Sequence, residues 1–431
     1  MLLINLGYFW STPELDDLNV IIQAQGVNAF NSLNRDGRTD LPGSENRLFD
    51  PQLYLQGLDT NGCTNVISRL STFPWLNPNA PEILQGEKQN TWEEKCFSSI
   101  NGTWPFEYTF ENIDDVNTAV ESCINHQIAF GVNGLILPSP LTSDLESDYS
   151  IEMAWVDSGI NVIPSDNELP VYATLAISDT ILTHRDPNKI ELLEIIVDQL
   201  TSRPELDGVY IVLEQTTPQS TYITGKRVAW GLLSLCHDLG IRGKLDVIVN
   251  FVNVFGFACV AAGAKSFGIG SSNKNKRLTF SDYLSRRGGP AFPKLYSHSL
   301  ILDLFPKRDI EAKILKERLL RLVSRNRTDY SDSLFTALEN GTDISLVPEW
   351  VESRNNTQYC KEHFFQRLKM AADEFNTEEN KINYILTWLQ DAERNSSYLA
   401  ERFNSDPLSA DIRHIKTWRA AFEEYINQYN L

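Results

Sequence analysis

Apolar stretches recur along the middle of the chain at a nearly constant spacing. Four of them begin near positions 134, 171, 208 and 245, about 37 residues apart, with helical patterns between them. A fifth covers residues 265–269 and follows a short apolar helix, near 254–262, that ends at Gly263. Two strands joined by a helix run parallel, because a hairpin would not need the crossover. The spacing therefore predicts five parallel strands in repeated strand–helix units.

The first 110 residues have room for three more strands, and Met1–Leu6 and Asn19–Gln23 have the apolar pattern of two of them. Eight strands would close a barrel. The alternative is an open doubly wound sheet, which usually carries a glycine-rich phosphate turn after its first strand. No such turn follows either stretch. We therefore predict an α/β fold with a (β/α)8 TIM-type barrel over residues 1–303.

The alternation of strands and helices ends near position 303. Helical spacing of apolar residues then predicts four helices, at 310–323, 359–375, 381–394 and 412–426. Residues 325–356 are polar and rich in turn formers, which favours a linker or a surface excursion. We therefore predict a helical C-terminal region over residues 304–431.

The N-terminal third is harder to interpret. An ordered element is expected to begin around Phe49, where Asp50 precedes Pro51. Asp50 could cap a helix that Pro51 opens, because proline is favoured in a first helical turn. The alternative is that Asp50 faces a pocket. Tyr54 is expected to pack in the core.

Composition limits the class of protein. The six cysteines are scattered without a C-x-x-C pair, which argues against a zinc cluster and a dense disulfide framework and suits a reducing cytoplasm. No apolar run has membrane-spanning length. The apolar N-terminus lacks the basic region of a secretion signal and is better interpreted as a strand. We predict a cytoplasmic protein, with no bound metal or cofactor, because no P-loop, H-E-x-x-H or EF-hand pattern occurs.

The charge is unevenly distributed. The chain carries −19 in total, but residues 265–327 contain 15 Lys and Arg against 5 Asp and Glu. That segment is therefore +10 and the remainder −29. An acidic body repels a polyanion except at such a segment, so the distribution predicts RNA, DNA or a nucleotide as partner there. The alternative is that the cations between Lys313 and Arg325 form the solvated face of one helix.

Candidate site residues follow the predicted strands, because ligands of parallel α/β folds bind at the carboxyl ends of the strands. Glu214 ends an apolar strand, where burial would raise its pKa toward a general acid or base role. Its alternative role is a salt bridge that holds the rim together. The other candidates are polar groups for substrate recognition and cations for phosphate: Asn250, Asn253, Ser271 and Ser272 for the substrate, and Lys274, Lys276 and Arg277 for phosphate.

With the strand and loop pattern of Gly208–Arg277 in place, the stretch AAGAKSFGIG at 261–270 resembles the tRNA-guanine transglycosylases. The resemblance implies a TIM barrel that exchanges a base through an aspartate nucleophile and holds a structural zinc. After Phe267, where the family places its catalytic aspartate, this chain has Gly268. The cysteine-rich zinc motif is also missing, with only Cys360 in the C-terminal region. No catalytic residue carries over.

Three functions are compatible with these patterns. The first is a nucleotide- or nucleic-acid-directed, transglycosylase-like barrel, either active or catalytically degenerate. The second is a non-catalytic structural subunit of a multiprotein or nucleoprotein complex, with a protein partner bound through the helical C-terminal region. The third is a small-molecule enzyme such as an aldolase or hydrolase, which needs a lysine or a carboxylate pair at the strand ends. Only Glu214 and Asp179 would qualify for such a pair.

Overall fold

The structure is a computed structural model of the 431-residue chain. It describes residues 1–7, 19–27, 47–101, 104, 113–144, 147, 149–183, 192–216, 220–284, 291–354 and 356–431. The described residues form two compact units. The barrel unit contains the described residues of the first 221 positions together with 231–284, and the helical unit contains Tyr222–Trp230 and residues 291–431.

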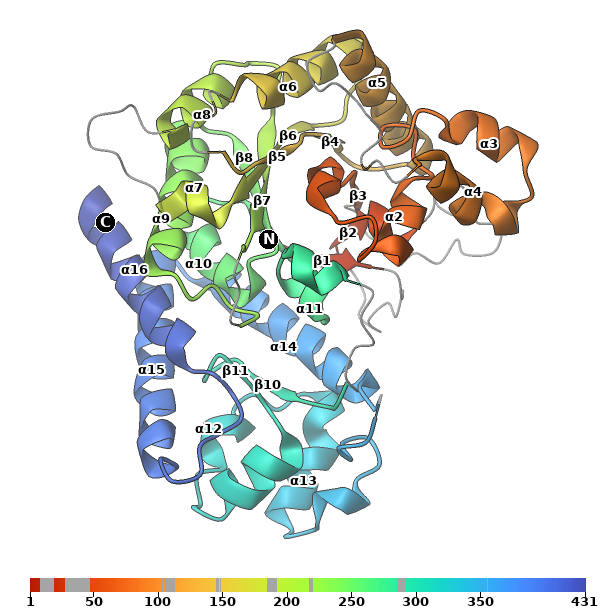
Figure 1. Cartoon of the computed structure of the whole chain (residues 1–431). Coiled ribbons are helices and arrows are strands. Elements are labelled where there is room, and N and C mark those ends of the chain that lie inside the picture. Colours follow the sequence, from red (N-terminus) through yellow and green to blue (C-terminus); the bar gives the residue numbers. More distant parts are fainter. Residues whose placement is uncertain are drawn as a thin grey trace. The chain divides into compact units, whose positions relative to one another are not determined.

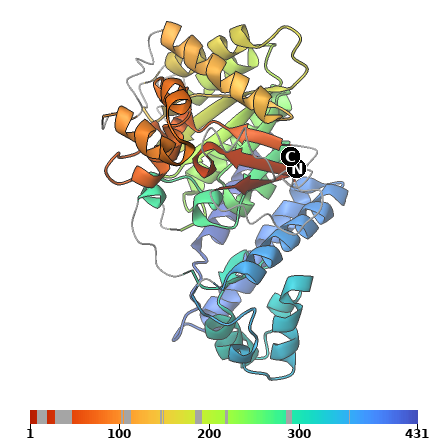
Figure 2. The ribbon, with the colours of Figure 1, turned by 90° about the vertical axis from the view of Figure 1, so that its right-hand side faces the viewer.

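Eight parallel strands in the described residues form the wall of the barrel unit (Figure 1). They are β1 (Leu2–Leu6), β2 (Asn19–Gln23), β3 (Arg47–Asp50), β4 (Leu135–Leu137), β6 (Val171–Ser178), β7 (Gly208–Glu214), β8 (Asp246–Asn250) and β9 (Ser266–Ile269). Their order in the sheet is β3-β2-β1-β9-β8-β7-β6-β4. The last of these strands along the chain, β9, therefore pairs with the first, β1. Strands β1 to β3 lie side by side in Figure 2. The short β5 (Leu141–Thr142) pairs with β6 outside this path.

The two ends of this sheet nearly meet. The backbone N–H of Asn133, just before β4, donates to the carbonyl of Arg47 on β3 at 2.8 Å. The N–H of Arg47 donates in return to Asn133 Oδ1 at 2.7 Å. The predicted TIM-type barrel is confirmed. The open doubly wound alternative is wrong, because the two end strands β3 and β4 come together through these hydrogen bonds while β9 pairs with β1.

Helices of the barrel unit lie outside the strands, as Figure 1 shows for α5, α6 and α8. The α-helices are α2 (Thr64–Leu70), α3 (Ala80–Gly86), α4 (Trp92–Ser99), α5 (Ile113–Phe130), α6 (Ser150–Val162), α7 (Asp179–Thr183), α8 (Leu192–Thr201), α9 (Lys226–Cys236), α10 (Gly256–Ala261) and α11 (Asn273–Lys276). A π-helix, η4 (His237–Arg242), continues α9, whose first residues belong to the helical unit. The 3-10 helices are η1 (Ala24–Gly26), η2 (Leu53–Gly57), η3 (Gln89–Thr91), η5 (Asn253–Phe255) and η6 (Phe280–Tyr283).

Small residues bring α10 onto the sheet. A Cβ at Gly256 would lie 2.2 Å from ring atoms of Phe267 on β9, so only glycine fits there. Gly263 ends the segment at φ +121, a conformation that side-chain-bearing residues rarely adopt. The predicted short helix and its glycine stop are thus confirmed, with the first turn wound as η5.

The helical unit begins, within its described C-terminal part, with a hairpin of antiparallel strands and continues as helices. The strands are β10 (Leu295–Ser297) and β11 (Leu302–Leu304). The helices are the π-helix η7 (Pro306–Leu315), α12 (Arg321–Ser324), η8 (Asp329–Ser331), α13 (Asp332–Glu339), η9 (Ile344–Leu346), α14 (Gln358–Thr377), α15 (Lys381–Arg402) and α16 (Arg413–Tyr429). No helix in the described ranges is long and apolar enough to cross a membrane.

Three predicted C-terminal helices are confirmed as α14, α15 and α16. The single helix predicted over 310–323 is wrong, because Arg318 at φ 59 separates η7 from α12. The linker predicted over 325–356 is also wrong. Its helix α13 buries Leu334 and Phe335, and the Trp350 indole is fully buried.

Candidate functional site

The carboxyl ends of the strands present an inward-facing set of polar side chains, which we call the polar ring. Its members are Asn5 of β1, Gln23 of β2, Asp50 of β3, Ser178 of β6, Glu214 of β7 and Asn250 of β8. Register supports a common face, because Gln23 pairs with Asp50 and Ser178 pairs with Glu214. Each member is at most 6 % exposed. A barrel core is normally apolar, so a buried polar layer at this end marks the candidate site.

Hydrogen bonds connect the polar ring across the barrel interior. Asn5 Nδ2 donates to Asn250 Oδ1 at 2.6 Å, although β1 and β8 are not neighbouring strands. Asn250 Nδ2 donates to the hydroxyl of Tyr210, which lies four residues before Glu214 on the same face of β7. The Tyr210 hydroxyl donates to Asp50 Oδ2 at 2.9 Å. One continuous network therefore joins β1, β8, β7 and β3.

Asp50 is the charged centre of this network. It is fully buried, and its Oδ2 also accepts from the hydroxyl of Tyr54 at 2.6 Å. Burial raises the pKa of Asp50 to about 6, while hydrogen bonds from Tyr54, Tyr210 and the Gln52 backbone act in the opposite direction. The carboxyl is therefore able to gain or lose a proton near neutral pH.

The predicted capping role of Asp50 is wrong. Asp50 is the last residue of β3, and the nearby 3-10 helix η2 is preceded by Gln52 at φ 56 instead. Pairing with β2 holds the segment extended up to Asp50 itself. Tyr54 is fully buried, but its hydroxyl has a polar role in the network besides packing.

Glu214 lies at the end of β7 and is 6 % exposed. Burial raises its pKa to about 7, the negative charge of Asp179 adds to that rise, and a hydrogen bond with Ser178 lowers it. The salt-bridge alternative receives no support, because none of the ion pairs formed within the described ranges involves Glu214. A second protonatable carboxyl therefore belongs to the polar ring.

Asn250 and Asn253 have different roles. The Asn250 side chain is part of the network, and its Oδ1 also accepts the Phe251 N–H at 2.8 Å. Phe251 and Asn253 both have positive φ, so the chain turns sharply after β8. Asn253 holds that turn, because its Nδ2 donates to the Thr221 carbonyl at 3.0 Å and its Oδ1 accepts the Val254 N–H at 2.9 Å. The hydrogen bonds of the Asn253 side chain thus stabilise the turn after β8.

The loop after β9 is not a cluster of free cations. Arg277 forms a two-point ion pair with Asp282, with nitrogen–oxygen distances of 2.9 and 3.0 Å, and also donates to the Ser220 carbonyl. Lys276 is only 6 % exposed. The Lys274 ammonium lies 5.2 Å from the ring centroid of Tyr283, and burial lowers its pKa. Lys274 is therefore the partly exposed cation of the predicted phosphate group that forms no ion pair with any residue in the described ranges.

The two serines of this loop are placed at the start of α11. Ser272 is exposed, and its carbonyl accepts the N–H groups of Asn275 and Lys276. Ser271 is half-buried. The structure therefore gives Ser272 a backbone role in the loop and leaves its hydroxyl facing solvent.

Six of the described cations in the basic segment 265–327 are paired with acids of their own unit. The pairs are Lys265–Asp246, Arg277–Asp282, Lys307–Asp343, Arg308–Glu352, Lys313–Asp406 and Arg327 with Asp332 and Glu339. The segment is therefore not one continuous cationic surface.

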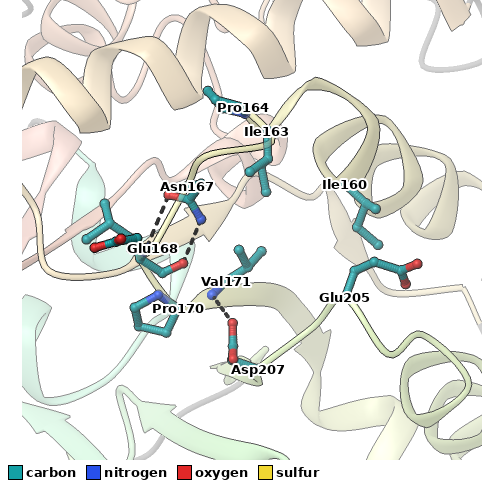
Figure 3. Close-up of a pocket in the computed structure, with 10 residues that line it drawn as sticks. Ile160, Ile163, Pro164, Asn167, Glu168, Pro170, Val171, Glu205 and Asp207 are labelled. Atoms are coloured by element: carbon teal, nitrogen blue, oxygen red, sulfur yellow. Dashed lines mark hydrogen bonds between the residues drawn. The ribbon is translucent and has the colours of Figure 1, made fainter.

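A cavity of about 420 Å³ lies at the opposite, amino end of the strands (Figure 3). Val171 begins β6, and its N–H donates to the Asp207 carboxylate at 2.8 Å. The wall combines aliphatic side chains with three acids, Glu168, Glu205 and Asp207. All the lining residues are Ile160, Ile163, Pro164, Asn167, Glu168, Leu169, Pro170, Val171, Glu205 and Asp207. None of the predicted site residues lines this cavity.

Sequence reasoning missed four residues at this end of the barrel, namely Asn5 and Gln23 of the polar ring and Tyr54 and Tyr210 of the network. A signal existed for the first two, because each is a carboxamide near the end of an apolar strand.

In the described part of the chain, no group of three or more His, Cys, Asp or Glu side chains could hold a metal ion. Comparison of the chain with protein-family models, curated proteins and solved structures gives no match.

Proposed function

We propose that the polar ring binds the base of a nucleotide or nucleic acid, and that Asp50 and Glu214 exchange protons with that base. One observation carries the proposal. Two buried carboxyls, whose pKa values are about 6 and 7, lie in the same ring as several carboxamides. Acid–base groups work best when their pKa lies near the operating pH. The site also lies at the end of the barrel where ligands of this fold bind.

Two unmatched amide atoms support a base as ligand. Asn5 Oδ1 and Gln23 Nε2 are buried and have no hydrogen-bond partner among the described residues. Each buried polar atom without a hydrogen bond lowers the free energy of unfolding by about 1–3 kcal/mol. They lie on the neighbouring strands β1 and β2 and offer one acceptor and one donor. The edge of a base carries complementary donors and acceptors, so a bound base would satisfy both atoms.

The other predicted residues take separate roles in this proposal. Asn250 orients Tyr210 and so holds Asp50. Lys274 is the proposed phosphate contact, because Arg277 is occupied by Asp282. The resemblance to transglycosylases would make the protein base-directed, but the family's nucleophile position holds Gly268. We therefore assign Asp50 and Glu214 to proton transfer.

The test is calorimetric binding of free bases and nucleosides to the wild type and to Asp50→Asn and Glu214→Gln. Glu205→Gln, which neutralises a carboxyl at the opposite end of the barrel, is the matched control. We expect binding to weaken at least tenfold in the two ring variants and to be unchanged in the control. Absence of base binding, or equal binding by all four proteins, would overturn the proposal.

A structural subunit remains the second candidate, and one observation favours it. Asp50 is fully buried and accepts from two tyrosines, so the network could serve only to join β3 to β7. In that case Asp50→Asn would lower the free energy of unfolding while no base or nucleoside bound to either protein.

A further inference from the structure

Four exposed cations within ten residues of the helical unit have no ion-pair partner in the described part of the chain. They are Lys316, Arg318, Arg321 and Arg325, which we call the cationic quartet. They lie between the end of η7 and the residue that follows α12, the helix labelled in Figure 1. Their charges are therefore available to a partner.

The acids close to the quartet in the sequence do not compensate this positive charge. Glu317 is the one acidic residue in the sequence from 312 to 328, and its carboxylate is bound by Arg402 at 2.8 Å. The flanking Lys313 and Arg327 are already paired with acids. The quartet thus carries about +4 on a chain whose net charge is −19, so a polyanion would be attracted here and repelled by most of the remaining surface.

The local fold keeps the quartet at the surface. After η7 ends at Leu315, Arg318 at φ 59 turns the chain, and the Leu319 N–H donates to the Ile314 carbonyl at 2.9 Å. Ile314 and Val323 are fully buried and anchor the two sides of this turn. The charged residues between and beside these anchors therefore face solvent.

We propose that the cationic quartet binds the phosphate backbone of a nucleic acid strand, which makes the ligand of this protein a polynucleotide rather than a free nucleotide. Three of the four residues are arginines, whose planar guanidinium matches the geometry of phosphate. No large apolar side chain between 312 and 328 is exposed, so the surface lacks the apolar contacts of a membrane-binding segment. The choice of nucleic acid among polyanions rests on the function proposed above.

The experiment measures anisotropy of a labelled single-stranded RNA of about 20 nucleotides, and of the matching DNA, between about 50 and 200 mM salt. The test variant replaces all four quartet residues with Gln. The matched control replaces four exposed cations that are already paired with acids, Lys226, Arg242, Arg394 and Arg413, with Gln. Thermal melts establish that both variants are folded.

We expect the quartet variant to lose at least tenfold in affinity, and its plot of log affinity against log salt to be shallower by about 3. The control should keep the wild-type slope. Equal binding by the wild type and the quartet variant would overturn the inference. So would binding of anionic vesicles by the quartet without binding of RNA or DNA.

Failure of this inference can be distinguished from failure of the proposed function. The quartet variant should bind a free base as the wild type does, because the polar ring is intact. If base binding depends on Asp50 while RNA and DNA do not bind, the ligand is a small nucleotide and only the quartet inference fails. If neither a base nor a polynucleotide binds, both fail.

Discussion

The Tyr210 hydroxyl on β7 donates a hydrogen bond of 2.9 Å to Asp50 Oδ2 at the end of β3. These residues are 160 positions apart, and their strands are not neighbours in the sheet. The bond therefore crosses the interior of the barrel. It places a protonatable carboxyl in a fixed position within the polar ring, where a packed barrel would ordinarily have an aliphatic side chain.

The first prediction concerns pH. The pKa of Asp50 rises from 3.8 to about 6 on folding, so between these values the folded protein binds more protons than the unfolded chain. The free energy of unfolding should therefore fall as the pH rises from about 4 to 6, by roughly 3 kcal/mol from this group. Glu214 acts in the same direction up to its pKa of about 7.

Urea denaturation of the wild type and Asp50→Asn at several pH values measures this contribution. The difference in unfolding free energy between the two proteins should change in favour of the variant as the pH rises through 4 to 6. A difference that is independent of pH would contradict the assigned burial and pKa of Asp50.

The second prediction concerns the tyrosine donors. Tyr210→Phe removes one hydrogen bond to Asp50 and leaves Asn250 Nδ2 without its acceptor. The variant should lose about 1–3 kcal/mol in unfolding free energy at neutral pH. The pKa of Asp50, measured by carboxyl carbon NMR, should rise further because its ionised form loses a donor. Tyr384→Phe in the helical unit is a control that should leave this pKa unchanged.

The third prediction separates ligand binding from stability. Gln23→Leu removes the unmatched Nε2 donor and also the acceptor of the Gln25 Nε2 hydrogen bond at 2.9 Å. These two effects oppose each other, so the unfolding free energy should change by less than about 1 kcal/mol. Base binding should nevertheless weaken at least tenfold. A large loss of stability with unchanged binding would assign Gln23 to the fold alone.

The fourth prediction tests the close packing of α10. Gly256→Ala places a methyl 2.2 Å from ring atoms of Phe267 and should cost about 1–3 kcal/mol or more. Gly86→Ala at the end of α3 is the matched control, because nothing lies within 4 Å of its added Cβ. The control should be neutral or slightly stabilising in thermal melts. Equal effects of both substitutions would contradict the described packing.

The repeated strands could be predicted because β6, β7 and β8 are apolar runs at regular spacing, which is a local signal. For Asp50 the sequence left a helix cap and a pocket-facing role open. Asp-Pro is a local signal for the cap, and pairing of β3 with β2 overrides it. The role of Tyr210 depends on a partner 160 residues away, which no local pattern reveals. The break at Arg318 likewise has no glycine or proline to announce it.

The charge pattern of the sequence located the cationic segment, but it did not show which of its cations are paired with acids. Arg277 and Asp282 are five residues apart, so their pairing could have been suspected from the sequence. Pairs such as Lys313 with Asp406 join residues 93 positions apart and appear only in the folded chain. The cationic quartet is therefore a property of the folded chain, in which Lys313 and Arg327 beside it are paired with acids.

Proton exchange on ligand binding tests the central claim most directly. Binding of a free base at pH 6.5 is measured by calorimetry in two buffers that differ in ionisation enthalpy, for the wild type and Asp50→Asn. The account predicts a net uptake or release of protons by the wild type that becomes smaller in the variant, because Asp50 titrates near this pH. Base binding without proton exchange, or with the same exchange in both proteins, would contradict it.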